Sequence, residues 1–200
     1  PDDSTILDIG IGTGYTYTKN KDLIIKKNLK VLGVDIDSEY IRNAQEAMNE
    51  CKLDKNISVI NQDIYQATET QIKPASFDYV LFSDSYAVIP NVHGMLSFCE
   101  KYLNSNGRMI VTSTLFDKFD PMVNWIKQRI FYFTSIEFGD MMIINDLENY
   151  AISRIDQNTN NNDSDLEFKI IDHKIIPIID FQMKTYMVQW SPKKRVTFAN

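Results

Sequence analysis

The stretch Asp8-Ile9-Gly10-Ile11-Gly12-Thr13-Gly14 decides the fold, because a short apolar strand there runs directly into a glycine-rich turn. Glycine is needed where the backbone turns sharply or where a ligand approaches it closely. The apolar run 6–9 leads into the turn, and a helical pattern from Tyr15 to Lys27 follows it. This order of strand, turn and helix predicts an α/β sheet with a nucleotide site at the turn.

The spacing of the glycines separates two kinds of nucleotide site. The dinucleotide fingerprint places its last two glycines three positions apart, whereas Gly12 and Gly14 are two apart. This difference disfavours an NAD-dependent oxidoreductase, which remains the weaker alternative. A glycine-rich turn alone is a weak indication of any one ligand, so the assignment depends on the residues that follow it.

Three further elements stand at the ends of the next apolar runs. Asp35 ends the run that begins at Lys30, about 20 residues beyond the turn, where a carboxylate can accept hydrogen bonds from both ribose hydroxyls. Asp63 follows the run Ile57–Ile60, where a carboxylate can accept from an adenine amino group. The run Phe77–Ser83 ends at the same predicted crevice. The alternative roles are a loop or helix-capping aspartate for Asp35 and a solvated loop acid for Asp63.

Helical patterns separate these runs and continue beyond them. Ser38 is predicted to cap a helix whose apolar positions recur at helical spacing as far as Cys51. Asn91 begins another helix, whose apolar face extends to Leu103, and Gly107–Thr112 is the fifth strand. Strands that alternate with helices imply parallel pairing with right-handed crossovers.

The C-terminal part has a different pattern. The runs Glu167–Ile176 and Gln182–Trp190 are strand-like, and the link between them is too short for a helix, so they should pair antiparallel. An insertion over about 116–165 precedes them, with Asp120-Pro121 as a helix start and an Asn-rich loop near its end. The predicted α/β fold is one domain over residues 1–200. It is a seven-stranded, mostly parallel sheet with helices on both faces, an antiparallel last strand and a helical insertion after strand five.

The four elements together resemble the class I, S-adenosylmethionine-dependent methyltransferases, and the resemblance covers residues 4 to 115 well. The stretch Tyr102–Val111 looks like the helix end, turn and fifth strand of that family, and the terminal hairpin looks like its sixth and antiparallel seventh strands. The resemblance implies S-adenosyl-L-methionine as cofactor and methyl transfer as the reaction. A helical segment usually precedes the first strand in this family, so we expect that an N-terminal segment is missing.

The same resemblance gives each predicted site residue a role toward the cofactor. Asp8 and the glycine turn would hold the methionine part, and Asp35 would bind the ribose. Ile36 would pack on the adenine face, while Asp63 and the backbone of Ile64 would read the adenine edge. The predicted cofactor-binding residues are Asp8, Gly10, Gly12, Gly14, Asp35, Ile36, Asp63, Ile64 and Ser83.

Methyl transfer from a sulfonium is an in-line displacement, for which a protein mainly supplies proximity, alignment and exclusion of water. A base is needed only when the nucleophile carries a proton near neutral pH. The candidates are Asp84, Tyr86 and His93, of which Asp84 is the best placed. The alternatives are a pocket-lining role for Tyr86 and an exposed position on a helix for His93.

The insertion is rich in aromatic side chains, and two interpretations fit it equally. The family commonly inserts specificity elements after strand five, so Trp125 and Phe131 are predicted to line the substrate pocket or its lid. In the other interpretation the helix simply packs on the sheet edge. The predicted acceptor is a small molecule, with a lipid or protein group as the other option. The alternative to an enzyme is a module that binds the cofactor or acts as a scaffold without catalysing a reaction.

Composition and the remaining motifs exclude several functions. A net charge of -6 disfavours a nucleic-acid partner, because phosphate neutralisation needs a basic surface. No apolar run approaches the roughly 18 residues that span a bilayer, and the first residues do not resemble a signal peptide. Cys51 and Cys99 are too few and too far apart for a disulfide framework or metal knuckle, which predicts reduced thiols in a cytoplasmic protein. No metal site is predicted, and the sequence leaves the oligomeric state open.

Overall fold

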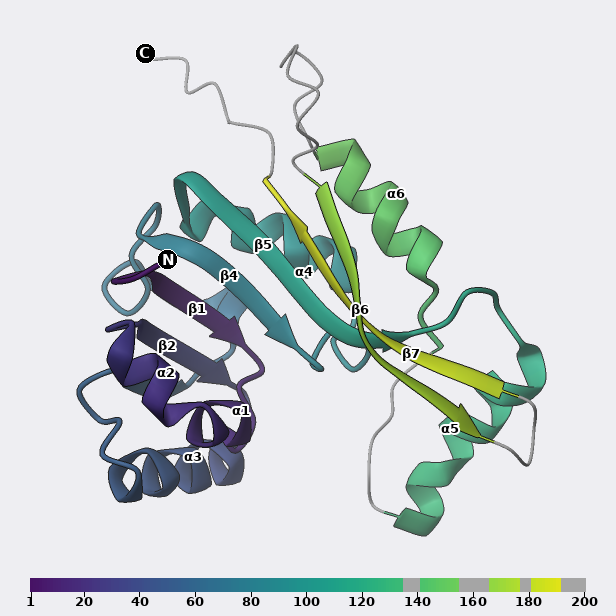
Figure 1. Cartoon of the computed structure of the whole chain (residues 1–200), viewed down its shortest axis with the longest axis horizontal. Coiled ribbons are helices and arrows are strands. Elements are labelled where there is room, and N and C mark those ends of the chain that lie inside the picture. Colours follow the sequence, from purple (N-terminus) through teal and green to yellow (C-terminus); the bar gives the residue numbers. More distant parts are fainter. Residues whose placement is uncertain (135–140, 155–165, 177–180, 192–200) are drawn as a thin grey trace.

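A computed structural model describes residues 1–134, 141–154, 166–176 and 181–191 of the chain. A single sheet forms its centre (Figure 1). The strands are β1 (Thr5–Ile9), β2 (Lys30–Asp35), β3 (Ile57–Asn61), β4 (Phe77–Ser83), β5 (Leu103–Leu115), β6 (Leu166–Ile176) and β7 (Phe181–Trp190). The helices are α1 (Tyr15–Lys19), α2 (Lys21–Lys26), α3 (Ser38–Glu50), α4 (Val92–Cys99), α5 (Pro121–Thr134) and α6 (Ile144–Arg154), with short 3-10 helices η1 (Ile64–Gln66) and η2 (Glu100–Tyr102).

The seven strands lie in the order β3-β2-β1-β4-β5-β7-β6. Pairing is parallel from β3 through to β5, whereas β7 is antiparallel to both of its neighbours, β5 and β6. The predicted seven-stranded, mostly parallel sheet with an antiparallel last strand is therefore confirmed. The chain proceeds from β1 to β2 on one side and returns to β4 on the other, and ligands of open α/β sheets bind at the carboxyl ends of strands at such a reversal.

Successive side chains of β1 point to opposite faces of the sheet, and both faces are covered by helices (Figure 1). Ile6 packs against the cluster that contains Ile24 of α2 and Met48 of α3. Leu7 belongs to the other cluster, which contains Leu96 of α4 and Leu147 of α6. The prediction of helices on both faces is confirmed. Burial of each such side chain contributes on the order of 1.5–3 kcal/mol, so the two clusters hold the strand ends in fixed positions.

The predicted continuous helix from Tyr15 to Lys27 is wrong, because the chain forms two short helices that meet at Asn20. Asn20 has φ -110° and ψ 22°, and its side-chain amide donates to the carbonyl of Thr16 at 2.7 Å. An asparagine that bonds to nearby backbone competes with the helix ladder. The break leaves α1 as a separate short element directly behind the glycine turn.

Asp37, and not the predicted Ser38, is the N-cap of α3. Its carboxylate accepts from the backbone amides of Glu39 at 2.7 Å and Tyr40 at 3.2 Å. A carboxylate at this position satisfies free amides and faces the positive end of the helix dipole. The cap fixes the corner between β2 and α3, which is where Asp35 lies.

The helix that begins after Asn91 is shorter than its apolar pattern predicts. It ends at Cys99 and passes into η2, and Leu103 already belongs to β5, so this strand begins before the predicted Gly107. Leu103 pairs with Phe77 of β4. Pairing with β4 therefore places Leu103, the last apolar residue of the predicted helix, in β5.

The insertion contains α5 and also α6, a helix that the sequence did not reveal. The predicted start of α5 is confirmed, because the Asp120 carboxylate accepts from the amides of Met122 at 2.9 Å and Val123 at 3.1 Å. The α6 helix packs back on the sheet, and the Arg154 guanidinium donates to the Glu100 carboxylate, with Nε 2.7 Å from Oε1. No helix in the described ranges is long and apolar enough to cross a membrane.

Candidate functional site

The glycine turn after β1 is built in left-handed backbone conformations. Gly10, Gly12 and Gly14 have φ values of 77°, 58° and 68°. A Cβ at Gly10 would lie 2.6 Å from Ser85 Cβ, and one at Gly14 would lie 2.4 Å from Met48 Cε. A Cβ at Gly12 would meet nothing within 4 Å. Positive φ thus favours glycine at all three positions and packing against Ser85 also requires it at Gly10, whereas Gly12 faces open space where a ligand can approach the backbone.

Asp35 connects this turn to the end of β2. Its Oδ2 accepts from the amide of Gly12 at 2.9 Å, and its Oδ1 accepts from the amide of Asp37 at 3.0 Å. The structure therefore brings together two predicted cofactor residues that are far apart in sequence. Each carboxylate oxygen has two lone pairs, so Asp35 retains the capacity to accept from two further donors.

Ile36 follows Asp35 at the same edge of the sheet and is 74% exposed. The amide of Asn61, at the end of β3, donates to the carbonyls of Asp35 at 3.0 Å and Ile36 at 2.8 Å. These bonds hold the ends of β2 and β3 together. A large, exposed apolar side chain at this edge can pack against the face of a flat ring.

Asp63, after β3, caps the 3-10 helix η1. Its Oδ1 accepts from the amide of Tyr65 at 2.9 Å, and its Oδ2 accepts from the side-chain amide of Gln66 at 3.0 Å. The side chain of Ile64 is buried beneath the turn. The structure thus adds a capping role to Asp63, which is half-buried and follows Gln62, whose amide donates to the carbonyl of Asp35 at 3.0 Å.

Asp8 is the buried acid of the site and is only 1% exposed. The hydroxyl of Tyr17, on α1, donates to Oδ2 of Asp8 at 2.7 Å, whereas Oδ1 is buried without a hydrogen-bond partner among the described residues. Burial raises the pKa of Asp8 to about 7, the hydrogen bond from Tyr17 opposes this, and the charge of Asp35 adds to it. Burial and the neighbouring carboxylate also raise the pKa of Tyr17 well above its usual range, so its hydroxyl keeps its proton.

Sequence reasoning missed Tyr17, and also Ser85, which ties the end of β4 to β1. The Ser85 hydroxyl is buried and donates to the carbonyl of Ile9 at 2.6 Å. Ser83 is the last residue of β4, and Asp84 follows it on an exposed turn with φ 58°. The amide of Asp84 donates to the carbonyl of Thr112 on β5 at 2.8 Å. Positive φ at a residue other than glycine costs free energy and recurs at functional sites.

Tyr86 and His93 lie together, with the tyrosine hydroxyl 3.3 Å from Nε2 of the imidazole. Tyr86 is buried, and burial together with the charge of Asp146 raises the pKa of its hydroxyl. His93 also stacks on Tyr150 of α6, with ring centroids 4.7 Å apart. Tyr86, which precedes α4, therefore contacts His93 on α4, and His93 contacts α6 through Tyr150.

The aromatic residues of the insertion do not share one environment. Phe116 is buried in a small cluster with Val123 and Met141. Trp125 is 55% exposed, and the guanidinium of Arg129 lies 4.1 Å from the centre of its ring. The side chain of Phe131 lies outside the described residues. The core interpretation thus applies to Phe116 and not to Trp125.

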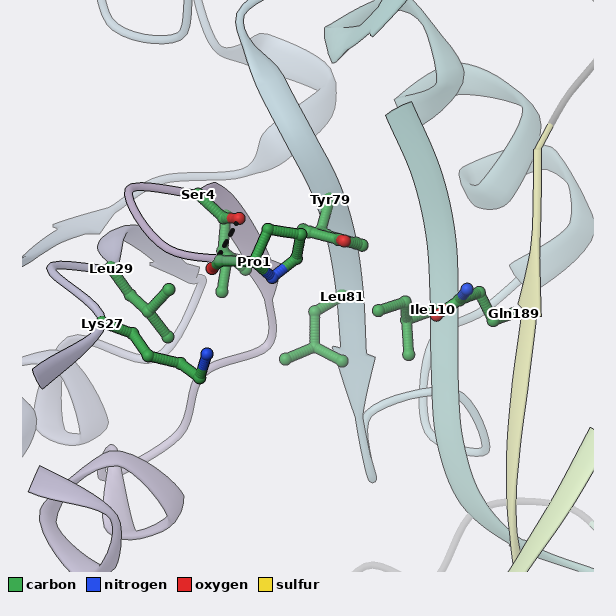
Figure 2. Close-up of a pocket in the computed structure, with 9 residues that line it drawn as sticks. Pro1, Ser4, Lys27, Leu29, Tyr79, Leu81, Ile110 and Gln189 are labelled. Atoms are coloured by element: carbon green, nitrogen blue, oxygen red, sulfur yellow. Dashed lines mark hydrogen bonds between the residues drawn. The ribbon is translucent and has the colours of Figure 1, made fainter. Parts of the chain in front are cut away.

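An open pocket lies elsewhere on the sheet, beside the N-terminus (Figure 2). Among its lining residues are Ile6, Lys27, Leu29, Tyr79, Leu81 and Ile110. Neither the glycine turn nor Asp35 nor Asp63 contributes to it. This pocket is therefore separate from the predicted cofactor site. The part of the chain that the structure describes contains no group of three or more metal-ligating side chains placed to hold a metal ion.

The strand order and the glycine turn that faces a carboxylate on β2 define the class I, S-adenosylmethionine-dependent methyltransferases. Residues 2–182 match the sequence model of a family described as "Methyltransferase domain". The chain belongs to this family. No curated protein sequence matches the chain.

Solved structures of methyltransferases share this fold. S-adenosyl-L-methionine-bound phosphoethanolamine N-methyltransferase 2 from Haemonchus contortus has a TM-score of 0.68 at 15% identity, with 96% of this chain and 49% of that chain covered. Geranyl diphosphate C-methyltransferase from Streptomyces coelicolor has a TM-score of 0.68 at 10% identity, covering 96% and 71%. An arsenic(III) methyltransferase from Chlamydomonas reinhardtii has a TM-score of 0.63 at 18% identity, covering 98% and 65%. The chain spans about half the length of the Haemonchus enzyme.

The family match confirms the predicted enzyme class, a methyltransferase that uses S-adenosyl-L-methionine. It also argues against the NAD-dependent oxidoreductase. At these low identities the structural likeness shows the fold alone, so neither the acceptor nor the role of any residue is transferred from these proteins.

Proposed function

We propose that S-adenosyl-L-methionine binds at the carboxyl ends of β1, β2 and β3, and that the chain transfers its methyl group to a small-molecule acceptor. The contact between the Gly12 amide and the Asp35 carboxylate carries this proposal, because it joins the glycine turn and the ribose acceptor into one site. Asp8, Ile36 and Asp63 stand around them on the same three strand ends.

The chemical groups at this edge fit the cofactor part by part. The open space above Gly12 leaves room for the ligand beside the backbone. The unpartnered Oδ1 of Asp8 matches the ammonium group of the methionine part, and Asp35 has lone pairs for the two ribose hydroxyls. Exposed Ile36 offers an apolar surface to adenine, with Asp63 and the backbone of Ile64 at the ring edge. When bound, the cofactor supplies a methyl group that is already activated by a positively charged sulfur.

The residues after β4 would handle the acceptor's proton, where it carries one. Tyr86 is a poor base because its raised pKa keeps the hydroxyl protonated, so we assign it the orientation of His93 through their hydrogen bond. His93 and the exposed carboxylate of Asp84 are then the groups that can accept a proton. Ser83, at the end of β4, would line the site between the cofactor and the acceptor.

The acceptor class rests on chemistry that varies among proteins of this fold. Phosphoethanolamine, geranyl diphosphate and arsenic(III) appear in the names of the three neighbours, so one fold serves very different small acceptors. Specificity must then come from elements that differ, and we assign this role to the insertion with Trp125 and Phe131. Turnover separates this proposal from a catalytically silent cofactor-binding module.

The first test is binding of S-adenosylhomocysteine to the wild type and to Gly12→Val, measured by calorimetry. We expect the wild type to bind this product and not NAD, and we expect the variant to lose binding. A Cβ at Gly12 would meet no atom within 4 Å, so the branched side chain of valine would occupy the space proposed for the ligand. The expected loss is at least about a hundredfold, which corresponds to roughly 3 kcal/mol.

Lys52→Val is the matched control for backbone strain. Lys52 has φ 58°, the same value as Gly12, but it lies after the C-terminal end of α3 and is none of the predicted cofactor residues. Lys52→Val adds a branched side chain at the same φ without replacing a glycine, so it should lose less melting temperature than Gly12→Val, and it should retain binding. Normal binding by a folded Gly12→Val variant, or tight binding of NAD by the wild type, would contradict the proposed cofactor site.

The second test concerns the insertion and uses Trp125→Ala. Because the indole is half exposed, its loss should cost little melting temperature. If it lines the acceptor pocket or its lid, kcat/KM for the acceptor should fall about tenfold while the affinity for S-adenosylhomocysteine stays nearly unchanged. The acceptor is first identified by a screen of acceptor classes with radiolabelled cofactor.

Leu23→Ala is the control for loss of an exposed apolar side chain, since Leu23 lies on α2 and is also about half exposed. It should leave kcat/KM unchanged. Equal kinetics of Trp125→Ala and the wild type would remove Trp125 from the acceptor pocket.

A further inference from the structure

Asp8 has two carboxylate oxygens in unlike surroundings, although the whole side chain is buried. Oδ2 accepts from the Tyr17 hydroxyl at 2.7 Å, and Tyr17 is itself 7% exposed. Oδ1 is buried without a partner among the described residues. A buried oxygen of a carboxylate is costly without a donor, so an unpartnered one in a native fold calls for an explanation.

The Asp8–Tyr17 pair lies next to the proposed ligand site. Asp8 lies one residue before the end of β1, and the glycine turn begins two residues after it. Tyr17 lies on α1, which begins directly after Gly14. The hydrogen bond therefore spans the two ends of the loop that approaches the ligand, and it leaves Oδ1 as the carboxylate oxygen of Asp8 without a donor.

We propose that Tyr17 is a positioning residue for the cofactor: its hydroxyl occupies Oδ2 of Asp8 and leaves Oδ1 to accept from the ammonium group of the methionine part, directly or through one ordered water. This inference rests on the proposed cofactor site and deepens it. Tyr17 does not touch the cofactor in this arrangement. It acts through the orientation and the charge of Asp8.

Binding of an ammonium group at Oδ1 has a consequence for protons. Burial raises the pKa of Asp8 to about 7, so a large fraction of the ligand-free protein carries a proton on this carboxyl at neutral pH. The ammonium group favours the carboxylate, so binding releases that proton from Asp8 to the buffer. Tyr17 and Asp35 are the titratable groups that act on Asp8, because its partners on β2 and β4 are Gly33 and Leu81.

The test is calorimetry of S-adenosylhomocysteine binding in buffers of different ionisation enthalpy, which measures the protons released. The wild type should release about one proton at pH 6 and almost none at pH 8, and its affinity should rise about fivefold from pH 6 to pH 7 and about tenfold in all by pH 8, where it levels off. Tyr17→Phe removes a hydrogen bond that favours the carboxylate, so proton release should persist at pH 8 and affinity at pH 7 should fall about five- to tenfold. Asp8→Asn should release no proton from this site at any pH.

Tyr15→Phe is the matched control, since Tyr15 lies on the same helix but is exposed, and its ring contacts Lys19 and not Asp8. It should behave as the wild type in both measurements. The amine of the free ligand titrates identically with every variant, and both tyrosine variants retain the Asp8 carboxylate, so differences among these two variants and the wild type belong to Asp8.

The outcomes separate this inference from the proposed function. If Tyr17→Phe releases protons with the same pH dependence as the wild type, the positioning role is wrong although the cofactor site stands. The same holds if the wild type binds without proton release while Gly12→Val abolishes binding. If the wild type does not bind S-adenosylhomocysteine, the proposed function and this inference both fail.

Discussion

Asp35→Ala should raise the dissociation constant for S-adenosylhomocysteine by at least about a hundredfold. A carboxylate that accepts from two ribose hydroxyls contributes roughly 1.5–3 kcal/mol per bond, because the acceptor is charged. The substitution would also remove the acceptor of the Gly12 amide, which holds the turn at 2.9 Å from Oδ2. Both effects weaken binding, and calorimetry of the ligand with the purified variant would measure their sum.

The loss of turn geometry must be separated from the loss of ribose contacts. Asp35→Asn retains one acceptor oxygen for the Gly12 amide but removes the charge, so its affinity should lie between those of the wild type and Asp35→Ala. Asp37→Ala removes an equal charge two residues away and costs about 1 kcal/mol of stability as a lost N-cap, but it retains the backbone amide that donates to Asp35, so ligand affinity should fall far less than in Asp35→Ala. An unchanged dissociation constant in Asp35→Ala would reduce Asp35 to an acid that shapes the turn.

The sequence predicts the sheet and the cofactor edge well because both depend on local signals. Alternating and continuous apolar runs define the strands, and the glycine turn needs backbone conformations that other residues resist. The ends of β1 and β2 meet in any parallel sheet of this kind, so Asp35 could be placed near Gly12 before any contact was known.

The predictions fail where a contact depends on residues distant in sequence or on competition at a helix end. Nothing local indicates that Ser85 donates to Ile9, or that α6 brings Tyr150 to His93. Asn20 interrupts a sound apolar pattern with one side-chain hydrogen bond to the backbone. Tyr17 carries a weak signal, because a tyrosine soon after the last glycine and a buried acid before the first are near enough in sequence to meet.

Stability of the ligand-free protein should depend on pH through Asp8. The pKa of this carboxyl is raised from 3.8 to about 7, mainly by burial. At pH values between these two, the folded chain therefore holds a proton that the unfolded chain has released. The free energy of unfolding then falls as pH rises through this range and levels off above about pH 7. At about 1.4 kcal/mol per pH unit, Asp8 accounts for a loss on the order of 3 kcal/mol between pH 5 and pH 8.

Asp8→Asn should remove this dependence. Urea unfolding at pH 5 and at pH 8 should therefore show the variant gaining about 3 kcal/mol relative to the wild type over that range, whatever the amide itself costs at both pH values. The comparison between pH values matters more than either stability alone. The hydrogens of the introduced side-chain amide also need partners in a buried place, and their cost does not depend on pH.

Asp78→Asn is the control, because the pKa of Asp78 is shifted in the opposite direction to that of Asp8. The carboxylate of Asp78 accepts from the amide and hydroxyl of Thr5 and from the amide of Asn104, and these bonds lower its pKa. Its contribution to stability is present above the ordinary pKa of an aspartate and is lost only as pH falls through the lowered one. Asp78→Asn should thus lower stability equally at pH 5 and pH 8. If Asp8→Asn gives the same parallel shift, Asp8 is ionised in the ligand-free protein across this range, and proton release on cofactor binding cannot come from it.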